Sequence, residues 1–290
     1  MIYLLIVSVL WSMSFGLIKS QVSGLDPFVV SAIRLGFSAL IFAPFLRHFK
    51  AKLVFELIII GLIQFGLMYC AYIASYKILA GHQIALLTTT TPIFVALIAL
   101  AIAKRWHFAP ILAAFIAVIG AIVIVYNPAM LKPTLMGLVL VQLSNICFAA
   151  GQIWYRNARK RHGLTNDISA FGWLYIGALI APIAFLLLNS TNPVLPHTGA
   201  QWASLAYLGL IPSALGFYLW NKGVTQVSSG TAATMNNLKI PGAVILAWLI
   251  FNETINLPRV IISIVLMAAA LWLAHEPQKN KQAALKYNAG

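Results

Sequence analysis

Residues 230–251 read GTAATMNNLKIPGAVILAWLIF, a stretch long enough to cross a bilayer that nevertheless carries two asparagines, a lysine and a proline near its middle. A related stretch, GHQIALLTTTTPIFVALIALAI, occupies residues 81–102. An offset of 149 residues, without a gap, places Pro92 under Pro241. The chain therefore contains a membrane-length segment twice. The length of the segment indicates a membrane protein, and its repetition indicates two related halves.

The composition extends this observation to the whole chain. Of 290 residues, 61% are hydrophobic and only 8% are charged, which lies far outside the composition of soluble domains. A helix needs about 20 apolar residues to cross the hydrocarbon core. The sequence predicts an all-α integral membrane protein with ten transmembrane helices and no room for a soluble domain. The ten stretches are 3–19, 27–46, 55–76, 83–103, 108–126, 134–155, 168–188, 201–221, 230–251 and 257–275.

The repetition covers two halves. The 149-residue offset also aligns Tyr69 with Tyr218, and near the start of each half the offset falls to 137 to 139. Each half holds five predicted spans, and an odd number inserts the second copy upside down. Inverted repeats are typical of secondary transporters, which bind substrate near the midplane and alternate access to it. The predicted units are an inverted pair of five-helix repeats, 1–129 and 130–277, and a cytoplasmic tail, 278–290.

The net charge of +14 would suggest nucleic acid in a soluble chain. Here thirteen of the nineteen basic residues fall at span ends on one side of the membrane, and four fall on the other. The positive-inside rule therefore predicts that both termini are cytoplasmic. The basic residues are expected to lie near anionic lipid head groups, and the net charge does not indicate binding to nucleic acid. Only Arg34 and Lys239 lie within predicted spans.

Lys239 is the more unusual of the two basic residues within predicted spans. It lies roughly 13 Å along its helix from the cytoplasmic end, where a charge costs about 2.5–3.5 kcal/mol. The five acidic residues all lie at the ends of spans, so a substrate carboxylate is one partner for the ammonium, and a neutral or snorkelling lysine is the alternative. Gly230, Thr234 and Pro241 in the same segment suit helix contact and a kink.

Other polar side chains follow single faces of spans. Gln142 and Asn145 share one face of the sixth span, and Gln64 and Tyr72 share one face of the third. Amides facing lipid are costly, so these side chains should point inward, either to bind substrate or to join helices. Arg34 lies close enough to its helix end for the guanidinium to snorkel to the membrane surface. Contact with a ligand is the alternative interpretation of this residue.

Aromatic residues divide by depth. Trp220 and Tyr175 lie near span ends and fit an interfacial belt. Trp173 and Tyr69 lie deeper and can form the wall of a site for an apolar ring. The predicted substrate-binding residues are Lys239, Asn236, Asn145, Gln142, Gln64, Tyr69, Tyr72, Trp173, Trp11 and Arg34.

Enzymatic chemistry is not expected. The sequence shows no Ser/His/Asp arrangement at a plausible spacing and no glycine-rich phosphate loop. Cys70 and Cys147 lie in apolar stretches with no pairing or metal-ligand pattern. We therefore expect no catalytic residues, cofactor or metal, and the sequence gives no signal of oligomeric state.

Ten spans in two inverted fives, the prolines at 92 and 241, and Phe-Asn-Glu closing the ninth span resemble the EamA-type branch of the drug/metabolite transporter superfamily. Lys104 stands where a glutamate often closes the fourth span, a departure without consequence for the fold. The stretches GLVLVQLSNICFAAGQIWYRN (137–157), FGWLYIGA (171–178) and WNKGVTQVSSGTAATMNNLKIPGA (220–243) are more specific. They resemble bacterial inner-membrane biotin transporters of the YigM type.

The resemblance implies a transporter of a small organic anion and favours biotin uptake. Lys239 would bind the carboxylate, the amides the ureido group, and Trp173 and Tyr69 the bicyclic ring. The alternative is an exporter of amino acids or related metabolites, and a scaffold or channel is a third. An amino-acid exporter should offer an anion to the substrate ammonium, and no acidic residue lies within a span. Because coupling usually uses a midplane carboxylate, the driving force stays open.

Overall fold

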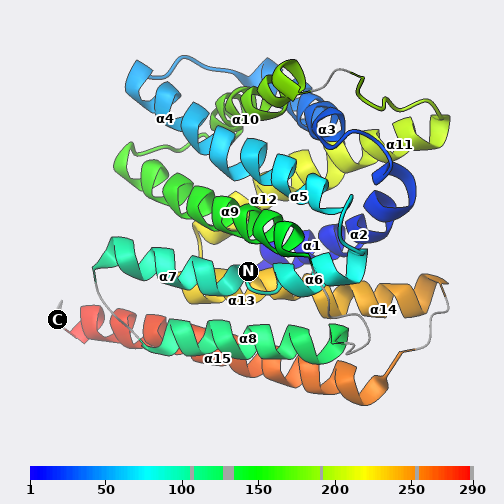
Figure 1. The fold of residues 1–290 in the computed structure, drawn as a ribbon. Helices are drawn as coiled ribbons and strands as arrows, with labels where there is room; N and C mark the ends of the chain where they lie inside the picture. The colour runs from blue at the N-terminus through cyan, green and yellow to red at the C-terminus, as the bar shows by residue number, and fades with distance from the viewer. Residues whose placement is uncertain (105–107, 127–133, 190–191, 252–254, 288–290) are drawn as a thin grey trace.

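The computed structural model describes residues 1–104, 108–126, 134–189, 192–251 and 255–287. Throughout these ranges the regular structure is helical. Helices are labelled α, and short 3₁₀ or π segments are labelled η, as in Figure 1. Their bounds in the first half are α1 Ile2–Ser12, α2 Ser14–Leu17, η1 Ile18–Val22, α3 Pro27–Phe42, η2 Ala43–Phe45, α4 Ala51–Gly61, η3 Leu62–Leu67, α5 Met68–Ser75, α6 Gly81–Thr88, α7 Thr91–Ala103 and α8 Phe108–Val125.

The second half repeats this plan with longer helices. Its bounds are α9 Leu135–Arg161, α10 Asp167–Asn189, α11 Gly199–Leu208, η5 Gly209–Leu215, α12 Gly216–Val224, α13 Ser229–Asn237, α14 Lys239–Phe251 and α15 Leu257–Tyr287. The predicted tail, 278–290, is helical as far as Tyr287, as the end of α15. Glu253 of the Phe-Asn-Glu motif lies outside the described residues.

Eight helical segments of the described chain are long and apolar enough to cross a membrane. The prediction of an all-helical multi-pass membrane protein is confirmed, whereas the count of ten spans is not. The two stretches that make the difference are 3–19 and 230–251. The first is divided into α1, α2 and η1, and the second is divided at Leu238 and contains two asparagines and a lysine. Both stretches combine an interrupted helix with polar residues.

The helices pack in layers that mix the two halves. Figure 1 shows α3, α4 and α10 together on one side, α8 and α15 on the opposite side, and α9 between them. The approach of α4 to α10 depends on glycine. A Cβ on Gly61 would collide with the backbone of Leu174, and a Cβ on Gly177 would collide with the backbone of Ile58. Without side chains at these two positions, the two backbones pack in direct contact.

Helix distortions recur at matching places. Adding 149 to the η3 range, 62–67, gives 211–216, which overlaps η5 at Gly209–Leu215. Adding 149 to Thr89, the first residue after α6, gives Leu238, the first residue after α13. Each of these two breaks lies three residues before a proline, Pro92 or Pro241, which cannot donate a backbone hydrogen bond. The same irregularity therefore interrupts the corresponding helix of both halves.

Candidate substrate-binding site

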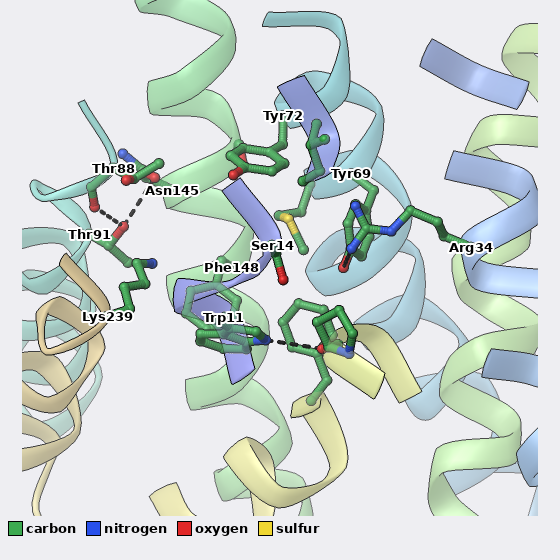
Figure 2. Close-up of a pocket in the computed structure, with 15 residues that line it drawn as sticks. Trp11, Ser14, Arg34, Tyr69, Tyr72, Thr88, Thr91, Asn145, Phe148 and Lys239 are labelled. Atoms are coloured by element: carbon green, nitrogen blue, oxygen red, sulfur yellow. Dashed lines mark hydrogen bonds between the residues drawn. The ribbon is translucent and has the colours of Figure 1, made fainter. Parts of the chain in front are cut away.

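The broken helices border a cavity inside the helix bundle. Side chains from α1 and α2, α3, α5, α6 and α7, α9, η5, α12 and α14 surround about 620 Å³ of space, including its opening to solvent. Figure 2 shows polar groups on two sides of this space and aromatic rings between them. Pockets for small ligands commonly combine an apolar lining with a few polar groups at defined points, as this cavity does.

The first break, between α6 and α7, leaves backbone carbonyls without helical partners, and side chains satisfy them. The Thr91 hydroxyl donates to the Thr88 carbonyl at 2.8 Å. The Asn145 amide donates to the Leu87 carbonyl at 3.0 Å. Asn145 reaches this point from α9, in the other half of the chain. It therefore has two positions at once: it completes the break, and it lies on the cavity wall.

The second break, between α13 and α14, is completed in the same way from α1. Ser8 Oγ lies 3.2 Å from the Met235 carbonyl, and Ser12 Oγ lies 2.9 Å from the Lys239 carbonyl. Each hydroxyl shares its single proton with a carbonyl of α1, at 2.9 Å for Ser8 and 2.6 Å for Ser12. Lys239 is the first residue of α14 and lines the cavity. The break therefore holds the backbone of the lysine in place while its ammonium stays available.

Lys239 makes only weak contacts with the protein. Its Nζ lies 3.4 Å from Asn236 Oδ1 and 5.5 Å from the centre of the Trp11 ring. In the described part of the chain, the ion pairs of acidic residues involve Glu56 and Asp167, with other basic groups. No carboxylate appears among the side chains that line the cavity. The ammonium thus faces the cavity without a negative partner there.

Arg34 is a second cation on the cavity wall, and it does not snorkel, because its side chain is only 2% exposed. One terminal nitrogen, Nη2, donates to the Tyr69 hydroxyl at 2.8 Å and to Ser213 Oγ at 3.2 Å. The guanidinium carbon also lies 4.4 Å from the centre of the Tyr69 ring. Nε and Nη1 have no hydrogen-bond partner among the described residues. Three N–H donors therefore remain unused in a buried position.

Aromatic rings form the wall between the two cations. Trp11 packs with its ring centre 5.8 Å from that of Phe148 and 5.2 Å from that of Phe217. The interfacial-belt interpretation of Trp220 and Tyr175 is wrong, since both side chains are fully buried. Their polar atoms are satisfied inside the protein, which removes the reason for an aromatic ring to seek the membrane surface.

Six predicted residues line the cavity together: Trp11, Arg34, Tyr69, Tyr72, Asn145 and Lys239. Gln142 lies behind this lining, where its Oε1 accepts from Thr90 at 2.8 Å. Asn236 is also behind it and accepts from Lys239. Gln64 is buried elsewhere and forms two hydrogen bonds, at 2.8 and 3.2 Å, with Asn221. Trp173 lies apart from the cavity, in a depression beside His48, and donates to the Arg47 carbonyl.

Several lining residues were not predicted. Thr88 and Thr91 belong to a run of four threonines, which the 149-residue offset aligns with residues 237–240, so the repeat itself could have indicated them. Met68 lies four residues before Tyr72 on the same helical face, so periodicity could have indicated it. Phe217 carries no such signal, because apolar residues in apolar helices look alike.

Helices that cross a membrane around a polar, ligand-sized cavity form the architecture of a transporter. The chain belongs to the EamA-like transporter family, which it matches over residues 1–126 and 135–274. It is accordingly a multi-pass membrane transporter and not an enzyme.

Individual relatives match over nearly the full length. A protein named "Probable biotin transporter" from Pseudomonas aeruginosa is 36% identical over 275 residues, which are 93% of this chain and 96% of that protein. Proteins named "Biotin transporter" from Salmonella typhimurium and Escherichia coli are each 35% identical over 280 residues, which are 94% of this chain and 92% of theirs. A solved crystal structure superposes with a TM-score of 0.72 at 16% identity and covers 94% of this chain and 95% of its own. The last match concerns the fold alone.

Proposed function

We propose that this transporter takes up biotin across the bacterial inner membrane and that the cavity between Arg34 and Lys239 is its binding site. The single observation that carries this proposal is the presence of two cationic side chains, and no carboxylate, on the lining of a cavity in a chain 35% identical to proteins named biotin transporters. Biotin is a small anion with an apolar ring. It matches the charge and the aromatic wall of the site.

The proposed architecture is ten membrane helices in two inverted repeats, residues 1–129 and 130–277. The matching π segments and the matching helix breaks support it. So do the two separate matches to the family, one in each half. In this arrangement α1–α2–η1 and α13–α14 cross the membrane as interrupted helices, which is common where a transporter builds its substrate site. Both termini are cytoplasmic in this proposal, as the distribution of basic residues favours.

Alternating access finds support in a pair of basic residues. Arg156 Nη1 donates to Ser229 Oγ at 3.0 Å, at the start of α13. The 137-residue offset places Lys19 in the position of Arg156, and the Lys19 side chain lies at Gly81, the start of α6. Lys19 also lines a second pocket of about 1260 Å³, including open solvent. Each half thus places a basic side chain beside the start of its interrupted helix, as two halves that exchange roles in alternating access should.

An exporter of amino acids or related metabolites is the alternative function. Such a substrate carries an ammonium, and the described cavity lining offers it no carboxylate. Uptake of radiolabelled biotin into cells that lack their own biotin carrier separates the two functions. We expect uptake that unlabelled biotin inhibits and that excess phenylalanine or leucine leaves unchanged. Absence of uptake, or equal inhibition by the amino acids, would contradict the proposal.

A further inference from the structure

We propose that the cavity binds its substrate in one direction, with the carboxylate on Arg34 and the uncharged polar ring group at the Lys239 end. This assignment rests on the proposed function, and it reverses the pairing that the sequence favours. It follows from which hydrogen-bond donors and acceptors remain free at each end of the cavity.

The Arg34 end offers donors only. Ser213 Oγ donates its proton to the Leu208 carbonyl at 2.7 Å, because a carbonyl can only accept. Ser213 must therefore accept from the Tyr69 hydroxyl, 2.8 Å away, so both hydroxyl protons are used. Arg34 donates to both oxygens through Nη2. What is left is the three unused N–H groups on Nε and Nη1.

A carboxylate has acceptors and no donor, so it matches this end in full. Its charge also compensates a guanidinium that is 2% exposed and has no ion-pair partner in the described structure. Hydrogen bonds between ions of opposite charge are stronger than those between neutral groups. The Tyr69 and Ser213 contacts fix the guanidinium before the anion arrives, which reduces the entropy cost of binding.

The Lys239 end is mixed. Lys239 supplies N–H donors, but the side chains beside it also present oxygens that can accept. Thr88 donates its proton to the Ala85 carbonyl, which leaves the lone pairs of its hydroxyl free. Asn145 Oδ1 lies 3.0 Å from Thr91 Oγ1, whose single proton is shared with the Thr88 carbonyl, and it retains a free lone pair. A carboxylate placed here would face these oxygens without a proton to offer them.

A cyclic urea has two N–H donors and one carbonyl acceptor, and this combination suits the mixed end. Its carbonyl can accept from Lys239, and its N–H groups can donate to Thr88 and Asn145. Figure 2 shows Lys239 and Arg34 on opposite sides of the cavity, with Trp11 and Phe148 between them. The apolar part of the substrate would lie against these rings. Each end of the cavity thus selects a different end of the ligand.

Binding of biotin and of neutral biotin amide to the purified protein tests the direction. For wild type we expect the acid to bind more tightly than the amide by roughly ten- to a hundredfold, the range of a charged hydrogen bond. Arg34→Gln should reduce this acid-to-amide preference to about one. Lys239→Gln should weaken both ligands together and retain the preference, because it removes a contact to the urea.

Three further variants keep the test decisive. Arg34→Lys retains the charge and should lower the preference only in part. Tyr69→Phe removes a hydroxyl that holds the guanidinium and should lower the preference several-fold. Lys77→Gln removes an exposed cation that does not line the cavity and should leave the preference unchanged. If Arg34→Gln cannot be purified in a folded form, Arg34→Lys and Tyr69→Phe still test the inference through the acid-to-amide preference.

The outcomes separate this inference from the function on which it rests. If wild type binds neither ligand, the proposed function fails. If wild type prefers the acid and Lys239→Gln abolishes the preference while Arg34→Gln retains it, biotin binds in the opposite direction and only the present inference is wrong. A preference that survives all the Arg34 and Tyr69 variants would overturn the inference as well.

Discussion

The two broken helices, α6–α7 and α13–α14, have the same backbone feature and different chemistry. Both are interrupted at equivalent residues, Thr89 and Leu238, and both have a proline three residues later. The first break is lined by a run of threonines that bond back to their own helix. The second carries Lys239 at the position equivalent to Thr90. The repeat thus provides a symmetric scaffold, and a single substitution between its copies places a cation at the second break and not at the first.

The breaks also differ in how the opposite half completes them. At the first break the two N–H groups of Asn145 lie among three acceptors, the Leu87 carbonyl, Thr90 Oγ1 and Gln142 Oε1. At the second break two serines of α1 each have one proton, which they share between a carbonyl of their own helix and a carbonyl at the break. The first break is therefore completed by one amide with two donors, and the second by two shared hydroxyl protons.

Exchanging the two positions should have the largest effect. In the double variant Thr90→Lys with Lys239→Thr, the charge is conserved but moves to the other break, where the Thr90 hydroxyl now shares its proton between Gln142 and the Leu87 carbonyl. We expect labelled biotin uptake to fall on the order of a hundredfold, or ~3 kcal/mol, because both a ligand contact and a hydrogen bond are lost. Protein level in the membrane is the control. Uptake near wild type would show that the position of the cation is immaterial.

Removing the amide that completes the first break should have an intermediate effect. Asn145→Leu leaves the Leu87 carbonyl without this donor, and we expect uptake to fall about tenfold, corresponding to ~1.4 kcal/mol. Ser8→Ala is the matched change at the second break, where Ser12 still contributes a bond, and uptake should fall only about threefold, or ~0.5–1.5 kcal/mol. Similar losses in the two variants would remove the distinction between the breaks.

The smallest functional effect is expected from a pair of cysteine variants that tests the inversion itself. The 137-residue offset relates Ser20 to Asn157, and inverted repeats place related residues on opposite sides of the membrane. With uptake unchanged, a membrane-impermeant thiol reagent should label Ser20→Cys in intact cells and Asn157→Cys only after permeabilisation. The native cysteines, Cys70 and Cys147, are buried and provide the background. Labelling of both variants in intact cells would contradict the inverted topology.

Much of the fold could be predicted because its determinants are local. Length and hydropathy define the spans, and the membrane permits little besides helices. Lys239 and Asn145 stood out for the same reason, since polar groups are costly in an apolar segment. Helical periodicity gave the face of Gln64 but not its partner, because the pairing with Asn221 joins residues far apart in the chain. Periodicity likewise could not give the depth of Trp173, whose indole is held by the Arg47 carbonyl.

The contact between α4 and α10 has a consequence for the history of the gene. Gly61 belongs to the first copy and Gly177 to the second, and each leaves room for the backbone of the other copy. After a duplication, neither copy could accept even an alanine at these positions without forcing the helices apart. A half taken from a relative should therefore function only when both sides of this contact are preserved, so that selection acts on the two halves as one inherited unit.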